Sequence, residues 1–448
     1  GSLTTKAIRQ PDGTFRIKGT KLFITVGDSD LVNNVVHPVL ARIEGDPAGT
    51  GGISIFLVPK YLVNDDGSLG RRNDYEIGKI EEKLGIHGSA TCLINFGDND
   101  NCYAELLGAE RQGMKIMFQM MNEARISVGM QGLTSASTAY LHALSYARER
   151  LQGSSLLDMK NPEAPRVPII QHPDVRRMLL WMKSNVDAMR GLMYYASAAI
   201  DRETVAKDEA EKDKWNGVLE LLTPICKAYC SDVGFKITEM AMQVYGGYGY
   251  CEDYPICQFM RDEKIASIYE GANGIQSLDL VGRKLGMKKG AYFMALLTEM
   301  SSTIALYKDA LPDLVPDFQE AVNALGEVGM FFAQCGKQGK FFVPIAHAYP
   351  FLMMMGKIVC AWILVWQAGI AKGKLDAIGK SNKVNPADMI AWASFVKENR
   401  DAAFYSGKLS SAKYFIKNVL PEVYAAVRAI KSEDISVVEI FEESFASG

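Results

Sequence analysis

The pattern of apolar residues changes at Gly113, and this change constrains the fold more than any other feature of the chain. Before it, short segments rich in Val, Ile and Phe are separated by turn sequences such as PDG and NDDGS, which is typical of β-strands. After it, apolar residues recur at steps of three and four, as on one face of a helix. The sequence therefore predicts a mainly α-helical protein with a small antiparallel β-barrel or sandwich in front.

The strand-like segments can be located individually. Alternation of apolar and polar residues, or enrichment in Val and Ile between Gly, Pro and Asp, predicts strands at 13–25, 33–43, 51–59 and 91–98.

Three long helical patterns follow, at 113–150, 172–200 and 216–247. Pro173 stands where a helix would begin, and the Gly246–Gly247 pair stands where one would end. With a fourth helix after Gly271, they predict a four-helix bundle over 113–285. Residues 286–448 predict a further helical domain, with Pro316 in the first turn of one helix.

Composition excludes several classes of protein. A net charge of −3, with both signs interspersed, argues against binding of nucleic acid. Five histidines and no HExxH or Cys/His cluster argue against a metal site. Eight cysteines without a CxxC pair indicate reduced thiols of an intracellular protein. The apolar segment 351–371 is interrupted by Lys357 and Gln367, which favours a buried helix over an integral membrane span.

One carboxylate stands out in the sequence SIYEGANGIQ, residues 267–276. Glu270 lies there among apolar and small residues. From these residues alone two interpretations stay open. The carboxylate is a solvated group at a helix end or loop, or it is a catalytic base in an apolar pocket, where desolvation would raise its pKa.

The region around Glu270 resembles the acyl-CoA dehydrogenase family. Residues 243–276 contain, in order, Q-x-x-G-G-x-G, Y-P, R-D-x-K-I-x-x-I-Y-E-G and I-Q. The segments GTKLFIT, EARISVGMQGL, YARERLQG and HPDVRRML resemble other motifs of the family, so the resemblance runs from residue 1 to about residue 285. Details such as IIQHPDVRRML and the long helical C-terminus resemble the large members, among them the branch acting on 3-methylmercaptopropionyl-CoA.

The resemblance implies an FAD-dependent dehydrogenase that desaturates an acyl-CoA thioester between its α and β carbons. Glu270 would remove the α-proton, while the β-hydrogen would leave as hydride to flavin N5. The backbone N–H of Glu270 and a flavin hydroxyl would bind the thioester oxygen. Two alternatives stay open: a flavin acyl-CoA oxidase of the same fold, and a non-catalytic scaffold that kept the fold.

The resemblance also assigns residues to binding roles. The expected substrate-binding residues are Asn122, Arg125, Tyr269 and Gly271. The expected cofactor-binding residues are Phe23, Thr25, Arg150, Gln152, Gln243, Gly246, Gly247 and Asn273. Plain structural roles compete with these assignments: a surface salt bridge for Arg125, strand packing for Phe23 and Thr25, and a helix cap for the glycines. Ala272 and Asn273 stand where most members carry hydroxyl residues, so one hydroxyl on the flavin side is expected to be lost there.

The expected organisation follows the same resemblance. Residues 1–112 would form the middle β-barrel domain, 113–285 the helical bundle with the catalytic Glu, and 286–448 an additional helical domain. The helical domain and flavin loop with which members of the family begin are expected to be missing ahead of residue 1. The implied partners are an acyl-CoA, an electron-transfer flavoprotein and a second copy of the chain, in a homodimer or a dimer of dimers. The implied location is the bacterial cytoplasm or, alternatively, the mitochondrial matrix.

Overall fold

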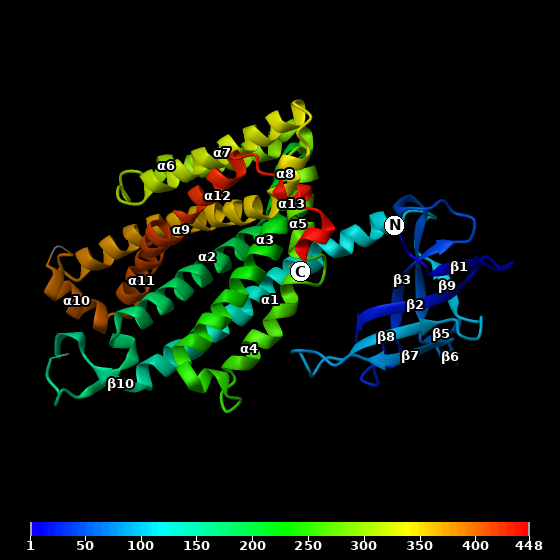
Figure 1. Cartoon of the computed structure of the whole chain (residues 1–448), viewed down its shortest axis with the longest axis horizontal. Helices are drawn as coiled ribbons and strands as arrows, with labels where there is room; N and C mark the ends of the chain where they lie inside the picture. Colours follow the sequence, from blue (N-terminus) through cyan, green and yellow to red (C-terminus); the bar gives the residue numbers. More distant parts are fainter. Residues whose placement is uncertain (1, 159, 387, 447–448) are drawn as a thin grey trace. The chain divides into compact units, whose positions relative to one another are not determined.

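The computed structural model describes residues 2–158, 160–386 and 388–446. It divides into two compact units, residues 1–124 and 125–448 (Figure 1). The division falls within helix α1 (Gly113–Glu149). The first unit holds the predicted strands and the second holds most of the helices.

The first unit is built on a seven-stranded sheet in the order β1-β3-β4-β9-β2-β8-β7. Because β1 also pairs with β2, five strands close into a ring, from which β8 and β7 extend. The parallel pairing of β1 with β3 makes the prediction of a wholly antiparallel arrangement wrong for this pair. The strands are β1 (Lys6–Arg9), β2 (Phe15–Thr25), β3 (Val36–Ile43), β4 (Ile53–Pro59), β7 (Tyr75–Ile80), β8 (Thr91–Phe96) and β9 (Tyr103–Leu106).

The four predicted strands are confirmed as β2, β3, β4 and β8. In β3, for example, Val39, Ala41 and Ile43 are buried at every second position, which is the period that places side chains on one face of a strand. Three further strands of the large sheet and the separate hairpin of β5 (Tyr61–Val63) and β6 (Leu69–Arg72) were not predicted. Each of these five strands has six residues or fewer.

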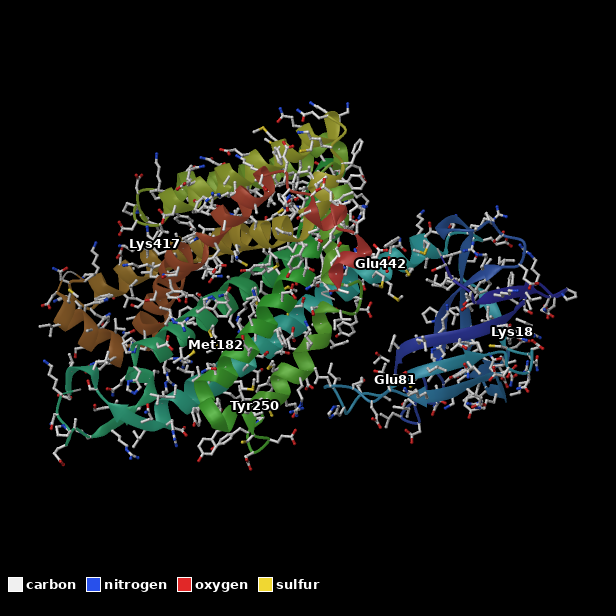
Figure 2. The ribbon with its side chains drawn as sticks, viewed as in Figure 1. Lys18, Glu81, Met182, Tyr250, Lys417 and Glu442 are labelled. Atoms are coloured by element: carbon white, nitrogen blue, oxygen red, sulfur yellow. The ribbon has the colours of Figure 1, made fainter. Side chains whose placement is uncertain are left out.

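The long helices begin and end where their sequence indicates. Helix α2 (Pro173–Thr204) has Pro173 in its first turn, which costs no hydrogen bond there. Helix α3 (Glu209–Tyr245) is capped by the Asp208 side chain, which accepts a bond from the Glu211 N–H, and ends at Gly246 with φ 62°. Met182 on α2 is fully buried among these helices (Figure 2).

Small residues let α1 and α3 approach closely. A Cβ atom on Gly129 would lie 2.5 Å from the carbonyl oxygen of Cys226, and one on Gly132 would lie 2.6 Å from that of Cys230. Ala136 and Ala139 continue the contact face of α1 and are fully buried. The two backbones are therefore in direct contact along this face.

The prediction of a helix after Gly271 is confirmed, since α5 begins at Asn273. The whole segment from 256 to 284 is broken rather than continuous. It consists of α4 (Ile256–Glu263), a 3₁₀ turn (Lys264–Ser267), α5 (Asn273–Asp279) and a π-helical turn (Leu280–Lys284). The break between the 3₁₀ turn and α5 contains Glu270.

The described residues beyond 286 are mostly helical, and Pro316 lies in the first turn of α7, as predicted. Their buried side chains join those of the bundle in one apolar core that runs from Leu133 to Ile430. The predicted domain limits at 112/113 and 285/286 stay predictions. The helices are α6 (Ala291–Tyr307), α7 (Val315–Lys337), α8 (Phe342–Ala346), α9 (Ala348–Ser381), α10 (Met389–Glu398), α11 (Arg400–Tyr414), α12 (Glu422–Lys431) and α13 (Ser436–Glu439).

Within the described residues, α9 alone is long and apolar enough to cross a membrane, and 78% of its most apolar window is buried inside the protein. Lys357, in the middle of this helix, forms an ion pair with Glu422 of α12. These contacts agree with the expectation of a buried helix in a helical domain.

Candidate functional site

The backbone around Glu270 adopts an uncommon conformation. Glu270 has φ 56° and Gly271 has φ 85°, so two consecutive residues lie in the left-handed region. For a residue other than glycine this costs about 1–3 kcal/mol and persists only where the surroundings hold it. The amide of Gln276, which is fully buried, supplies such a hold: its Nε2 donates to the carbonyl oxygens of Gly271 at 3.1 Å and Glu270 at 3.5 Å.

Several polar groups of this turn have no hydrogen-bond partner among the described residues. Among the described residues, the N–H groups of Glu270 and Gly271 donate to no protein acceptor, and the half-buried Glu270 carboxylate has no ion pair or hydrogen bond. A buried or half-buried backbone donor is nearly always satisfied. The Glu270 turn (residues 270 and 271) therefore offers a carboxylate and two unused N–H donors side by side.

Beneath the turn lies a buried polar network. Lys227 of α3 is fully buried and its Nζ donates to Oδ1 of Asn273 at 2.8 Å. The Asn273 amide in turn donates to Oγ of Ser231 at 3.0 Å and to the Ala228 carbonyl at 3.3 Å. Burial lowers the pKa of Lys227 to about 8. Since both ends of the Asn273 side chain are occupied by α3, its predicted role toward the cofactor would require these bonds to be released.

Arg125 is also held inside the protein. It is 6% exposed, and its Nη1 lies 3.4 Å from Oδ2 of Asp279 on α5. Asp279 also forms ion pairs with Arg283, whose Nε lies 2.8 Å from Oδ1, and with the buried Lys284. Arg125 therefore does form a salt bridge, but a partly buried one and not one at the surface. One atom of the guanidinium, Nε, is buried without a partner among the described residues.

Tyr269 and Glu263 complete the surroundings. The half-buried Tyr269 donates its hydroxyl hydrogen to Gln131 of α1. Glu263, at the end of α4, is fully buried, and neither of its carboxyl oxygens has a hydrogen-bond partner among the described residues. Burial raises the pKa of Glu263 to about 8. Sequence reasoning missed Glu263, Lys227 and Asp279.

A second group of predicted residues lines one hollow of about 610 Å³ at the end of α3. Arg150, Gln152, Gln243, Gly246 and Gly247 all contribute to it. The other lining residues are Tyr146, Ile169, His172, Val175, Val244, Tyr245, Tyr248 and Cys251. Thus five of the eight predicted cofactor residues lie together, although they come from segments about 90 residues apart.

The hollow is open and cationic. The Arg150 guanidinium lies over the Tyr248 ring, 5.5 Å from its centre, and forms no ion pair with any described residue. Nothing lies within 4 Å of a Cβ placed on Gly246 or Gly247, so an incoming group can approach the backbone there. Tyr250, in the same turn, is 85% exposed (Figure 2).

The remaining predicted residues lie in the first unit. Phe23 is 72% exposed with φ 59°, at a register shift between β2 and β8, so its ring does not pack in the sheet core. Thr25 is exposed at the end of β2, and Asn122 is half-buried, one turn before Arg125 along α1.

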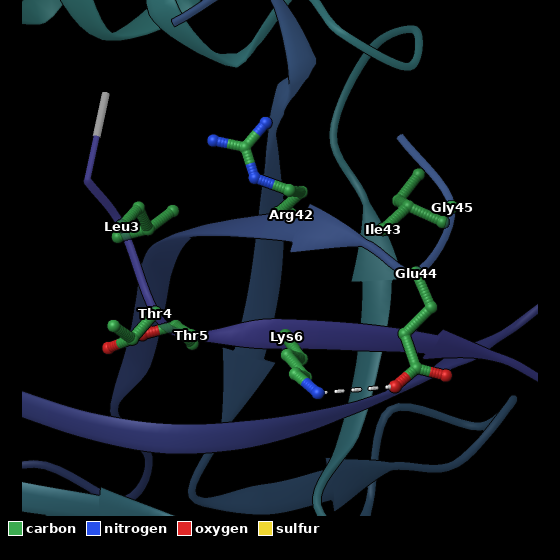
Figure 3. Close-up of a pocket in the computed structure, with 8 residues that line it drawn as sticks. All are labelled: Leu3, Thr4, Thr5, Lys6, Arg42, Ile43, Glu44 and Gly45. Atoms are coloured by element: carbon green, nitrogen blue, oxygen red, sulfur yellow. Dashed lines mark ion pairs between the residues drawn. The ribbon is translucent and has the colours of Figure 1, made fainter. Parts of the chain in front are cut away.

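The first unit also has a hollow of about 460 Å³ beside β1 and β3 (Figure 3). Its charged groups include Lys6 and Glu44, which lie 3.8 Å apart and are both largely exposed. None of the predicted site residues lines it. The hollow therefore has no connection to the residues predicted from the sequence.

Comparison with known proteins gives matches along the chain. The family described as acyl-CoA dehydrogenase, C-terminal domain, matches residues 111–285. The family described as acetyl-CoA dehydrogenase C-terminal like matches residues 296–440.

Two relatives match most of the chain. A butyryl-CoA dehydrogenase of Syntrophomonas wolfei subsp. wolfei is 39% identical over 458 residues, covering 99% of this chain and 70% of the relative. The 3-methylmercaptopropionyl-CoA dehydrogenase of Ruegeria pomeroyi is 35% identical, covering 94% of this chain and 67% of the relative.

Two solved structures share the fold. ACDH-11 of Caenorhabditis elegans, in complex with C11-CoA, superposes with a TM-score of 0.72 at 20% identity, covering 93% of this chain and 61% of that chain. An acyl-CoA dehydrogenase of Bacillus anthracis complexed with FAD superposes with a TM-score of 0.59 at 18% identity, covering 96% of this chain and 69% of that chain. At these identities the likeness concerns the fold alone.

Proposed function

The chain belongs to the acyl-CoA dehydrogenase family, and on that premise we propose that it desaturates an acyl-CoA thioester, with Glu270 as the base and FAD as the cofactor. The observation that carries the proposal is the Glu270 turn. It combines an unpaired carboxylate with backbone N–H donors that have no acceptor among the described residues.

This combination suits the removal of a proton next to a thioester. The α-proton is weakly acidic, so the reaction needs a base at the carbon and hydrogen-bond donors at the oxygen, where negative charge develops. The Glu270 carboxylate takes the proton, and the Glu270 N–H donates to the thioester oxygen. The partly buried Arg125–Asp279 pair links α1 to α5 and so supports the element that follows the turn.

The residues that line the hollow at the end of α3 fit FAD. Arg150 forms no ion pair with the residues that the structure describes, and its planar fork of N–H groups matches a diphosphate. Gly246 and Gly247 leave their backbone open to the same group. When bound, FAD supplies the acceptor for the two electrons and the hydrogen that leave the β-carbon. Gln152, Gln243 and the backbone of the glycine turn would hold it.

The names of the relatives support a dehydrogenase acting on short acyl-CoA thioesters, because they are described as acting on butyryl-CoA and on 3-methylmercaptopropionyl-CoA. We therefore propose a short acyl chain and an electron-transfer flavoprotein as the electron acceptor. The hollow around Arg150 lies on the surface of one chain, which is consistent with a cofactor shared by two copies in a homodimer.

Anaerobic absorbance spectroscopy tests the proposal. The chain loaded with FAD is mixed with butyryl-CoA and longer acyl-CoAs, and bleaching of the flavin is followed. Glu270→Gln should bind the thioester but slow bleaching by at least about 10³-fold, as expected for loss of a base. Glu252→Gln, at an exposed glutamate, is the matched control. Normal bleaching in Glu270→Gln would reject the role of Glu270, and oxygen consumption in place of acceptor reduction would indicate an oxidase.

A further inference from the structure

Lys227 is an unusual residue for the interior of a helical protein. Its side chain is fully buried on α3, yet it forms no ion pair with any residue that the structure describes. Removing an ammonium group from water costs several kcal/mol unless it gains compensating contacts. A lysine in such a position requires an explanation beyond the packing of its aliphatic stem.

The single described acceptor of the Lys227 amine explains the position. Oδ1 of Asn273 lies 2.8 Å from Nζ, and Asn273 is the first residue of α5, three residues after Glu270. Ala272, the residue before α5, provides no side-chain cap to the helix. Lys227 donates to the Asn273 amide oxygen, and the Asn273 amide nitrogen donates to Oγ of Ser231 and to the Ala228 carbonyl, so these bonds attach the start of α5 to the rigid helix α3.

The Glu270 turn is thus held through α5, the helix that follows it. Gln276 binds its carbonyl oxygens from within α5, but α5 has only seven residues and cannot itself fix the turn. The bond between Lys227 and Asn273 supplies the connection to the core. The charged groups that act on Lys227 come from three elements: Arg125 on α1, Asp232 on α3 and Glu270 in the turn.

We propose that Lys227 is a positioning residue for the reaction of Glu270: acting through Asn273, it anchors α5 to α3 and so holds the Glu270 carboxylate and N–H in their working geometry. This inference rests on the proposed function for its catalytic consequence, although the anchoring itself does not depend on it. No covalent step is assigned to Lys227.

Hydrogen exchange tests the anchoring without cofactor or substrate. In Lys227→Met, which keeps the stem but removes the amine, the hydrogen-bonded amides of α5, residues 275–279, should exchange at least about tenfold faster than in the wild-type chain. Exchange in α6 should not change. Lys183→Met is the matched control, because Lys183 pairs with Asp187 on α2, away from α5. Unchanged exchange at residues 275–279 in Lys227→Met would overturn the proposal.

A double-mutant cycle shows whether Lys227 acts through Asn273. Asn273→Asp places a carboxylate opposite the amine, so this variant should stay folded with Lys227 present and unfold at lower denaturant when combined with Lys227→Met. The loss in the double variant should exceed the sum of the single losses. Additive losses would contradict a direct contact in solution.

Flavin reduction then separates a positioning role from a general loss of structure. In Lys227→Met the limiting rate of reduction should fall at least about tenfold, because small displacements of reacting groups are costly. The dissociation constant for the acyl-CoA should change less than about threefold. A higher dissociation constant for the acyl-CoA together with an unchanged limiting rate of flavin reduction would overturn the positioning role of Lys227. If no acyl-CoA reduces the flavin of the wild-type chain, the proposed function fails. The exchange data and the double-mutant cycle would still show whether Lys227 anchors α5.

Discussion

Nε2 of Gln276 lies 3.1 Å from the carbonyl oxygen of Gly271, and this bond keeps the residue after Glu270, the proposed base, in a left-handed conformation. A Cβ added at Gly271 would lie 2.7 Å from the same Nε2. Glycine is thus required at this position both by φ 85° and by the space that Gln276 occupies.

We therefore expect Gly271→Ala to slow reduction of the flavin by an acyl-CoA by about 10²-fold, because the Glu270 N–H and carboxylate lose their relative placement. The measurement is the limiting rate in rapid mixing, with circular dichroism to establish that the helices remain. Gly274→Ala is the control, since nothing lies within 4 Å of a Cβ at that glycine. Equal rates in the two variants would contradict the role of the turn geometry.

Glu263 should make stability depend on pH. Its folded pKa is raised from 4.5 to about 8 by burial, so the native state keeps a proton that the unfolded chain releases. Above pH 4.5 the wild-type chain therefore loses stability as pH rises, by up to about 1.4 kcal/mol per pH unit until about pH 8.

Glu263→Gln removes this dependence, because an amide does not ionise. Its stability relative to wild type, measured by urea unfolding, should increase between pH 5 and pH 8. Glu239→Gln, at an exposed glutamate of α3, should show no such trend. A constant difference between Glu263→Gln and wild type across this range would disprove the assignment of a buried proton.

The Arg125–Asp279 pair should contribute more to stability than the Arg283–Asp279 pair. Arg125 is buried, so Arg125→Leu leaves Asp279 with one fewer compensating charge in the interior and should lower the free energy of unfolding by about 3 kcal/mol. The Arg283 side chain is 54% exposed, and Arg283→Leu should cost less than about 1 kcal/mol. Chemical denaturation of both variants gives the comparison, and a reversed order would count against it.

Arg150 should determine the affinity for FAD. Removing the guanidinium in Arg150→Leu should weaken FAD binding by at least about tenfold, since an arginine bound to a diphosphate makes charge-assisted hydrogen bonds. The dissociation constant is measured by fluorescence of the released flavin. Arg148→Leu, at an exposed arginine two residues earlier and outside the hollow, is the control. Similar affinities for the two variants would show that the hollow does not hold the diphosphate.

Much of the secondary structure could be predicted because it depends on local patterns. Alternation located β2, β3, β4 and β8, and Pro173 and Gly246 marked a helix start and a helix end. The short strands β1 and β7 could not be found in this way. They exist because neighbouring strands pair with them, and β1 does so in parallel with β3.

The roles of charged residues depended far more on packing. The sequence analysis assigned no role to Glu263 in the run Arg261-Asp262-Glu263-Lys264, yet Glu263 is fully buried beside α1 and α3. Nothing in the sequence relates Lys227 to Asn273, which are 46 residues apart and meet only when α5 packs on α3. Arg125 and Asp279, 154 residues apart, are a further case.

The order and spacing of motifs by themselves determined the family, the identity of Glu270 as the proposed base and the set of residues proposed for FAD, because these depend on residue type along the chain. Only the tertiary structure decided which side chains are available. It directs Asn273 into α3, pairs Arg125 with Asp279 and leaves the N–H of Glu270 without an acceptor among the described residues. The physical reason is that burial and hydrogen bonding arise from contacts between helices distant in sequence, and no local pattern encodes those contacts.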